Sequence, residues 1–218
     1  MKINTKIFLV DDHSLVRDGL KLLIHKYPGF EVCGEAEDSS QALEGIHQNN
    51  PDLVIVDLFL KKGFSGLELI KDLRVQFPSL RLIVVSMYEE SLYGVRALKA
   101  GAHGYVMKKE SSQKIMDAIH RVMQGGVYIS DSLAGSLVSG VQRSPQGIND
   151  SFTEILSDRE MEVFQYLGHG KTTIQISETM GLSQKTVHSY CSRIKEKLNL
   201  SNYNELLRES VKCVEINK

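Results

Sequence analysis

The first 125 residues alternate five short apolar runs with stretches of helical periodicity, and this alternation constrains the fold more than any other feature of the chain. The runs are continuous and rich in Val and Ile, as in strands that are buried on both faces. A chain that repeats strand and helix in this way forms a parallel sheet with helices on both sides. The five expected strands are residues 7–10, 32–36, 53–56, 82–85 and 104–107.

Apolar residues recur at helical spacing between these runs and predict which side chains face the sheet. One helix is expected to begin with Ser14 as its N-cap and to present Leu15, Leu22 and Leu23. Gly125 and the glycine after it stop the last helix, so the first domain is predicted to span residues 1–125. The apolar residues of two other helices are Leu67, Leu69, Ile70 and Leu73, and Ile115, Met116, Ile119, Val122 and Met123.

A polar segment separates this domain from a second one. Residues 126–152 are predicted to be a linker, with a short helix over residues 131–139 and then a stretch that contains two Gly and one Pro. Residues 153–218 carry no strand signal. We expect them to form a small all-α domain of four helices.

Capping residues mark two of these four helices. Residues 157–160, Ser-Asp-Arg-Glu, are a capping box, and Ser183 is a good N-cap for the third helix, which should end near Leu198. The second and fourth helices are expected over residues 172–180 and 203–214. The predicted inward residues are Met161, Phe164 and Leu167 of the first helix and Ile174 and Ile176 of the second.

The composition excludes several classes of protein. The chain has 26 Lys and Arg against 27 Asp and Glu, so a nucleic-acid site must be local and not a general coat of positive charge. No apolar run approaches the about 20 residues of a membrane span, and no leader precedes the first strand. The cysteines, Cys33, Cys191 and Cys213, have no metal or redox spacing. We therefore expect a cytoplasmic protein without membrane association.

Charged and polar residues follow four of the predicted strands. Asp11 and Asp12 end the first strand, Asp57 the third, Ser86 the fourth and Lys108 the fifth. Because ligands of parallel sheets bind at the carboxyl ends of the strands, these side chains should meet at one edge. Three adjacent carboxylates should raise one pKa unless a hard cation such as Mg²⁺ neutralises them. A lysine and a hydroxyl beside them suit a phosphoryl group, which an aspartate can accept as an acyl phosphate.

Each of these residues alone has a commoner structural explanation. Acidic residues before a helix complement its dipole, and an Asp after a strand often forms a turn or cap. Ser86 and Lys108 are each compatible with an ordinary loop position. Their occurrence together at four strand ends is what indicates a functional site.

These strand ends resemble the receiver domain of two-component response regulators. The resemblance covers about residues 5–125 and implies a flavodoxin-like (βα)5 fold. It also implies that Asp57 accepts a phosphoryl group from the phosphohistidine of a sensor histidine kinase. The motifs that carry it are Val10-Asp11-Asp12-His13, Asp57, Ser86 and Gly101-Ala102-His103-Gly104-Tyr105-Val106-Met107-Lys108.

The resemblance assigns further roles around the acceptor. It implies that Asp11, Asp12 and Asp57 bind Mg²⁺ together with the backbone carbonyl of Phe59. It implies that Lys108 holds the phosphoryl oxygens. Apart from Mg-dependent gain and loss of its own phosphoryl group, the protein is not expected to be an enzyme.

Two further residues would respond to the phosphate. By the resemblance, Ser86 turns toward the phosphoryl group and Tyr105 follows it inward as an aromatic switch residue. The added charge and acceptor atoms can bias a loop that has two states.

The loop after Asp57 departs from the usual receiver pattern. It lacks the Pro that normally stands four residues on, and it is one residue longer before Gly66. Phe59 and Tyr88 lie two residues past Asp57 and Ser86. We hypothesise that these two aromatic residues shield the acyl phosphate from water.

Residues 172–198 have the layout of a helix-turn-helix, with a glycine in the turn between two helices. The second helix carries Lys185, Arg193, Lys195 and Lys197 against the single Glu196. Concentrated positive charge is what phosphate contact requires. A solvated amphipathic helix also carries such charges, and the charges alone favour that interpretation over a DNA-binding helix.

The motifs of this region resemble the LuxR-type helix-turn-helix, and its combination with a receiver resembles the NarL/FixJ group of response regulators. The motifs lie at residues 156–160, 170, 174–177, 182–188 and 194–198. Val187 and Ile194 are expected in the core. By the resemblance, the residues that face double-stranded DNA are Lys185, Thr186, His188, Ser189, Ser192 and Arg193.

The expected function is that of a phosphorylation-controlled transcription regulator that binds paired DNA half-sites as a homodimer. Leu206, Leu207 and Val211 of the last helix could form the dimer contact or belong to the core. One alternative is a pseudo-receiver or phosphorelay protein whose helical module binds protein and not DNA. A second is a hydrolase with Asp57 as nucleophile, although Phe59 stands where such enzymes place a second acid.

Overall fold

The computed structural model describes residues 4–60, 65–139, 152 and 155–216. The chain forms two compact units, residues 1–137 and 138–218. Within the described residues, no helix is both long and apolar enough to cross a membrane.

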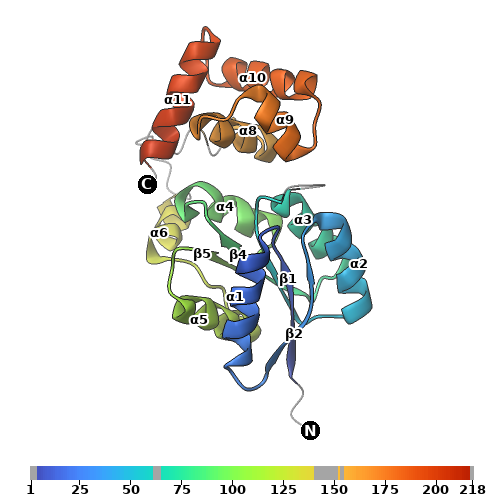
Figure 1. The fold of residues 1–218 in the computed structure, drawn as a ribbon. Helices are drawn as coiled ribbons and strands as arrows, with labels where there is room; N and C mark the ends of the chain where they lie inside the picture. Colours follow the sequence, from blue (N-terminus) through green and yellow to red (C-terminus); the bar gives the residue numbers. More distant parts are fainter. Residues whose placement is uncertain (1–3, 61–64, 140–151, 153–154, 217–218) are drawn as a thin grey trace. The chain divides into compact units, whose positions relative to one another are not determined.

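The first unit is built on a sheet of five parallel strands in the order β2-β1-β3-β4-β5 (Figure 1). This confirms the predicted parallel α/β fold. The strands are β1 (Thr5–Val10), β2 (Phe30–Ala36), β3 (Leu53–Val56), β4 (Arg81–Ser86) and β5 (Gly104–Met107). The helices between and after them are α1 (Ser14–His25), α2 (Ser39–Asn49), α3 (Gly66–Gln76), α4 (Glu90–Ala100) and α5 (Ser112–Met123).

Alternate strand residues face two helical layers. On one side, Ile7, Leu9 and Ile55 form a single buried cluster with Ile24 of α1 and Ile119 of α5. On the other side the ring of Phe8 fills the space between β2 and α2, where Gly34 and Gly45 leave room for it. The sheet is therefore buried on both faces, and its carboxyl edge remains for a site.

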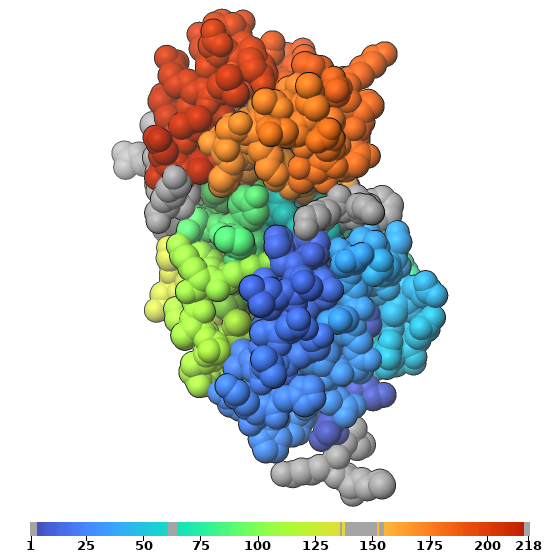
Figure 2. Space-filling model, viewed as in Figure 1, coloured from blue at the N-terminus to red at the C-terminus, as the bar shows by residue number. Residues whose placement is uncertain are grey.

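The prediction for the core face of α1 was partly wrong. Leu15 and Leu22 are 83% and 70% exposed, whereas Leu20 and Ile24 are buried and Leu23 packs partly against the core. Leu15 and Leu22 are seven residues apart, so they share one stripe, and that stripe is the outer one. The N-cap position belongs to His13, which makes no side-chain cap, and not to Ser14. Figure 2 shows α1, in dark blue, at the surface of the first unit.

The predicted inner faces of two other helices are confirmed. Ser65 and Glu68 form a capping box at the start of α3. The four apolar residues predicted for α3 are all buried, as are Ile115, Met116, Ile119 and Val122 of α5, while Met123 is partly buried.

The packing of the first unit continues past α5. Tyr128 forms a parallel bridge with Gly104 at the open edge of β5, and a further helix, α6, spans Asp131–Ser139. The compact unit therefore runs to Leu137, beyond the residue 125 at which the sequence places the end of the first domain.

The described part of the second unit contains four helices and no strand, as predicted. They are α8 (Asp158–Gly168), α9 (Thr173–Met180), α10 (Gln184–Lys197) and α11 (Tyr203–Ile216). Capping boxes begin α8 at Ser157 and α9 at Thr172. Fully buried residues that join the four helices are Met161, Phe164, Leu167, Ile176, Val187, Ile194, Leu206 and Cys213.

The inward prediction for α9 was wrong for Ile174. Ile176 is fully buried but Ile174 is 51% exposed. Residues two apart lie on nearly opposite sides of a helix, so the core can take only one of them. In α11, Leu206 is likewise buried in the core, and Val211 is exposed.

Candidate functional site

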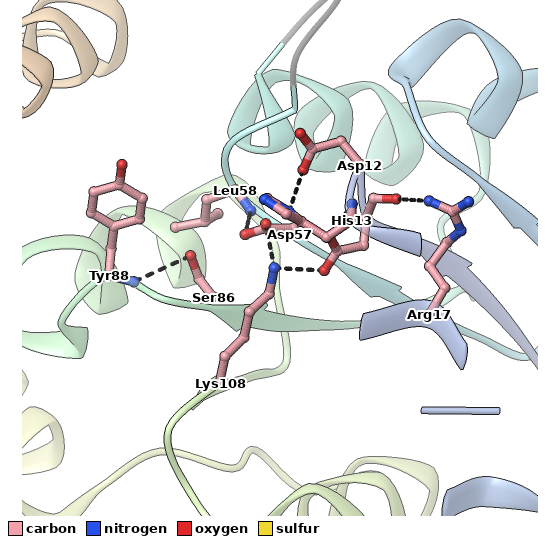
Figure 3. Close-up of polar contacts among 9 residues, drawn as sticks. Asp12, His13, Arg17, Asp57, Leu58, Ser86, Tyr88 and Lys108 are labelled. Carbon is pink, nitrogen blue, oxygen red and sulfur yellow. Dashed lines mark hydrogen bonds and ion pairs between the residues drawn. The ribbon is translucent and has the colours of Figure 1, made fainter. Parts of the chain in front are cut away.

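The strand-end residues meet at the carboxyl edge of the sheet, as predicted. β1, β3, β4 and β5 are consecutive neighbours, and backbone bonds continue between the residues just past them. The amide of Asp57 donates to the carbonyl of Val10 at 2.8 Å, and that of Lys108 donates to the carbonyl of Ser86 at 2.7 Å. The parallel register therefore carries these side chains to adjacent positions (Figure 3).

Lys108 bridges two buried carboxylates. Its Nζ lies 2.6 Å from Oδ2 of Asp11 and 2.6 Å from Oδ2 of Asp57. The two aspartates are only 3% and 4% exposed. One ammonium thus neutralises part of a site with more negative than positive charge.

The pKa directions follow from this burial and charge. Burial raises the pKa of Asp57; the charge of Lys108 opposes the rise and that of Asp11 adds to it. For Lys108, burial acts to lower the pKa, but the charge of Asp57 and the hydrogen bonds that Lys108 donates to both aspartates outweigh it and raise the pKa. The rise has the direction expected from the sequence, but its largest cause is burial and not repulsion between the carboxylates.

Asp57 is held from several sides. Its Oδ1 accepts a hydrogen bond from the amide of Leu58 at 2.7 Å. The Ser86 hydroxyl accepts from the amide of Tyr88 at 3.5 Å and acts to lower the pKa of Asp57. Gly66 packs so closely against the carbonyl of Asp57 and the Cα of Leu58 that no Cβ fits there. Residues 61–64, which include the position of the missing Pro, lie outside the described residues.

His13 belongs to the pocket, which the sequence did not indicate. Its Nδ1 lies 2.8 Å from Oδ1 of Asp12 and 3.2 Å from Oδ1 of Asp11. One donor atom from each of Asp11, Asp12, His13 and Asp57 lies within 4.8 Å of the other three. This largely carboxylate set is compatible with a divalent cation.

Arg17 helps to hold Asp11 in place. Its Nη1 donates to the backbone carbonyl of Asp11 at 2.6 Å (Figure 3). The sequence offered no signal for this role, because a basic residue one turn into a helix is ordinarily a surface charge.

Four aromatic rings lie beside the acidic pocket. Phe59 stacks on Tyr88, and both rings contact the edge or face of the buried Tyr93. Tyr105 is 2% exposed and its hydroxyl donates to the carbonyl of Tyr88 at 2.8 Å. Burial raises the pKa of Tyr105 well above its usual range, so this hydroxyl keeps its proton and remains a donor. Tyr105 is therefore already in an inward position.

In the second unit, α10 presents a polar face. Five of the six residues predicted to face DNA are exposed: Lys185, His188, Ser189, Ser192 and Arg193. Thr186 is half-buried, and its hydroxyl lies 2.8 Å from that of the N-cap residue Ser183. Val187 and Ile194 are fully buried, which confirms their place in the core. The exposed residues recur at three- and four-residue spacing and so share one face of the helix.

Comparison with protein-family models decides what these two units are. The model of the response regulator receiver domain matches residues 7–120, and that of bacterial regulatory proteins of the luxR family matches residues 154–210. The chain is a response regulator of the NarL/FixJ group. The aspartate-nucleophile hydrolase considered from the sequence is thereby set aside.

Individual relatives cover nearly the whole response regulator. It is 31% identical to the oxygen regulatory protein NreC of Staphylococcus carnosus, over 95% of this chain and 97% of that protein. It is 30% identical to the transcriptional regulatory protein DegU of Brevibacillus brevis, over 95% and 93% of the two chains. RcsB of Salmonella enterica serovar Typhimurium, solved on the promoter P1flhDC with the phosphomimetic BeF3-, matches with a TM-score of 0.68 and 25% identity, over 95% and 98%.

Proposed function

We propose that this response regulator controls transcription by binding DNA through α10, and that phosphorylation of Asp57 sets this activity. The observation that carries the proposal is the bridge from Lys108 to two buried carboxylates. A lysine in this position neutralises the charge of Asp57 before transfer. After transfer its ammonium group can form hydrogen bonds with the phosphoryl oxygens, because its bonds to the carboxylates are easily exchanged.

The phosphoryl transfer is a displacement at phosphorus. A carboxylate oxygen of Asp57 attacks the phosphoryl group of a phosphohistidine on a sensor histidine kinase. The O–P bond forms as the P–N bond breaks, and the imidazole leaves with the electron pair. Oδ2 of Asp57 already contacts Lys108, so the charge that develops on the phosphoryl oxygens meets a cation at once.

We propose Mg²⁺ as the cofactor, held by Asp11, Asp12 and Asp57 and by the backbone carbonyl of Phe59. When bound, Mg²⁺ neutralises charge on the phosphoryl oxygens and helps to align the two reacting groups. The donor set fits, since carboxylates within 4.8 Å of one another are the ligands this ion prefers. The imidazole of His13 completes the wall of the same pocket.

Ser86 and Tyr105 are proposed to pass the signal on. The Ser86 hydroxyl accepts from the amide of Tyr88 at 3.5 Å, and a phosphoryl group on Asp57 would offer new acceptors to its proton. Tyr105 bonds to the carbonyl of Tyr88, two residues past Ser86. Phosphorylation would favour the inward position of Tyr105, because only the arrangement with Tyr105 inward allows the added hydrogen bonds to the phosphoryl group.

The output is proposed to be binding of double-stranded DNA by a homodimer, in the cytoplasm, where kinase and promoter are both within reach. The exposed face of α10 carries Lys185 and Arg193 for phosphate contact and His188, Ser189 and Ser192 for the groove. The RcsB structure on a promoter supports this, since it matches both units of the chain.

The test combines chemistry and binding. We expect the wild type to gain one phosphoryl group by intact mass after incubation with acetyl phosphate and Mg²⁺, and Asp57→Asn to gain none. DNA binding that weakens with rising salt would then support the output. Binding to a protein in place of DNA would favour the phosphorelay alternative, and no phosphoryl gain would favour the pseudo-receiver.

A further inference from the structure

The segment that follows α5 is fastened to the switch region at three points. We name residues 127–133 the clasp. At the first point, the backbone amide of Tyr105 donates to the carbonyl of Tyr128 at 3.0 Å, and the amide of Tyr128 donates to the carbonyl of His103 at 2.9 Å. The clasp thereby covers the open edge of β5.

The second point joins the clasp to the start of α4. Oε1 of Glu90, the first residue of α4, accepts a hydrogen bond from the amide of Ser130 at 3.1 Å. Glu90 is only 8% exposed, so its carboxylate is largely shielded from solvent where it contacts the clasp. The Ser130 hydroxyl in turn accepts from the amide of Leu133 at 3.1 Å and starts α6.

The third point is apolar. Leu133 is 3% exposed and packs on Gly94 in the middle of α4. A Cβ on Gly94 would lie 2.5 Å from Cδ2 of Leu133, so this glycine lets the two helices approach. Helix α6 therefore packs on α4, and Glu90 at the start of α4 also accepts the hydrogen bond from Ser130.

These contacts close a ring around Tyr105. Its hydroxyl donates to the carbonyl of Tyr88, and its backbone amide donates to the carbonyl of Tyr128. Glu90 stands two residues past Tyr88, Ser130 stands two residues past Tyr128, and these two bond to each other. A movement of the Tyr105 backbone, or of Glu90 at the start of α4, must therefore strain or break a contact of the clasp.

We propose that the clasp reports the state of Asp57 to the chain that leads to the second unit. This rests on the proposed function. The docked clasp occurs together with the inward Tyr105, and phosphorylation favours the inward Tyr105, so phosphorylation tightens the clasp. When the clasp is docked, the connecting chain starts after α6; when it is released, the chain starts after α5 and has a longer reach.

Thermodynamic linkage requires that clasp docking and phosphorylation affect each other equally. If phosphorylation tightens the clasp, release of the clasp must weaken the preference for the phosphorylated state by the same factor. The phosphoryl analogue beryllofluoride measures this preference without a covalent step.

The experiment uses the full chain and three variants. Leu133→Ala removes the apolar contact and Glu90→Ala removes the acceptor for Ser130. Gly135→Ala is the matched control, because it lies in α6 at an exposed position where an added methyl meets nothing within 4 Å. Amide hydrogen exchange of residues 127–133 is measured with and without acetyl phosphate and Mg²⁺, intact mass gives the phosphoryl content, and calorimetry gives the affinity for beryllofluoride.

In the wild type and in Gly135→Ala, we expect phosphorylation to slow exchange in the clasp at least threefold. In Leu133→Ala and Glu90→Ala this slowing should be lost, and beryllofluoride should bind several-fold more weakly. Full phosphoryl gain with unchanged exchange, or unchanged beryllofluoride affinity in both variants, overturns the clasp and leaves the proposed function standing.

A wild type that gains no phosphoryl group overturns the proposed function instead. In that case, hydrogen exchange of the unphosphorylated variants tests whether the clasp is coupled to α4. Faster exchange at the start of α4 in Leu133→Ala than in Gly135→Ala would support the coupling, and equal exchange would overturn it.

Discussion

The ring of Phe59 stacks on the ring of Tyr88, with centroids 3.9 Å apart and planes inclined by 24°. Both residues follow neighbouring strands: Phe59 lies three residues past Val56, the end of β3, and Tyr88 lies two residues past Ser86, the end of β4. Each ring also lies against Tyr93, 5.5 and 5.7 Å away between centroids. On the shielding hypothesis, a stack so anchored limits the access of water to an acyl phosphate on Asp57.

Loss of the stack should therefore shorten the life of the phosphoryl group. For Phe59→Asn and for Tyr88→Ala we expect hydrolysis to be faster by roughly tenfold, which corresponds to about 1.4 kcal/mol in the barrier. The decay of the phosphorylated species by intact mass measures this. Met87→Ala is the matched control, because Met87 lies between Ser86 and Tyr88 but is 72% exposed. Equal half-lives in all four proteins would contradict the shielding hypothesis.

The charge balance of the pocket predicts opposite effects for two substitutions. Burial raises the pKa of Asp57, so at neutral pH the charge of its buried carboxylate lowers the free energy of unfolding. This loss of stability becomes smaller as the pH drops toward 3.8, where the carboxyl group takes up a proton in the unfolded protein as well. Asp57→Asn should raise the free energy of unfolding by about 1 kcal/mol near pH 7, since Lys108 keeps Asp11 as partner. Urea denaturation near pH 7 and near pH 4 should show the gain shrinking at the lower pH.

Lys108→Ala should do the reverse. It leaves two buried carboxylates without their cation, and breaking such a group costs about 3 kcal/mol. Because the lost partner favours the ionised carboxylates, the destabilisation should be larger near pH 7 than near pH 4. A Lys108→Ala protein as stable as the wild type at both pH values would show that the pocket is more open to solvent than its burial indicates.

Gly66 is expected to be irreplaceable for steric reasons. A Cβ there would overlap the backbone carbonyl of Asp57, and backbone cannot move aside as a side-chain end can. We expect Gly66→Ala to lower the free energy of unfolding by at least about 2 kcal/mol and to reduce phosphoryl gain. Gly19→Ala is the control: this glycine lies in α1 with nothing within 4 Å, so alanine should stabilise the helix by about 0.5–1 kcal/mol. Equal stability of the two variants would be incompatible with the close approach of Gly66.

The exposed cations of α10 should contribute through phosphate contact. Lys185→Ala and Arg193→Ala should each weaken binding to any DNA duplex and reduce the slope of log affinity against log salt by about 0.9. Fluorescence anisotropy at several salt concentrations measures both quantities. Lys212→Ala, on the exposed side of α11, is the control and should change neither. If all three variants lost affinity equally, a general charge effect would replace the assignment to α10.

Local sequence patterns suffice to predict the parallel α/β unit, the four-helix unit, and the aspartates and lysine of the acidic pocket. The apolar runs and the capping box at Ser157 depend on residues a few positions apart, which is why such patterns can be read from the sequence. Asp57 and Lys108 could be placed together because a parallel sheet carries every strand end to one edge.

Only the tertiary structure decided which face of an element is covered and which groups touch. Helical spacing groups Leu15 with Leu22, but packing against the sheet decides that their stripe faces outward. The role of His13 in the pocket and the ring of contacts through Tyr105 depend on distances between atoms far apart in the chain. These distances are set by how whole layers pack, and no local pattern of residues encodes them.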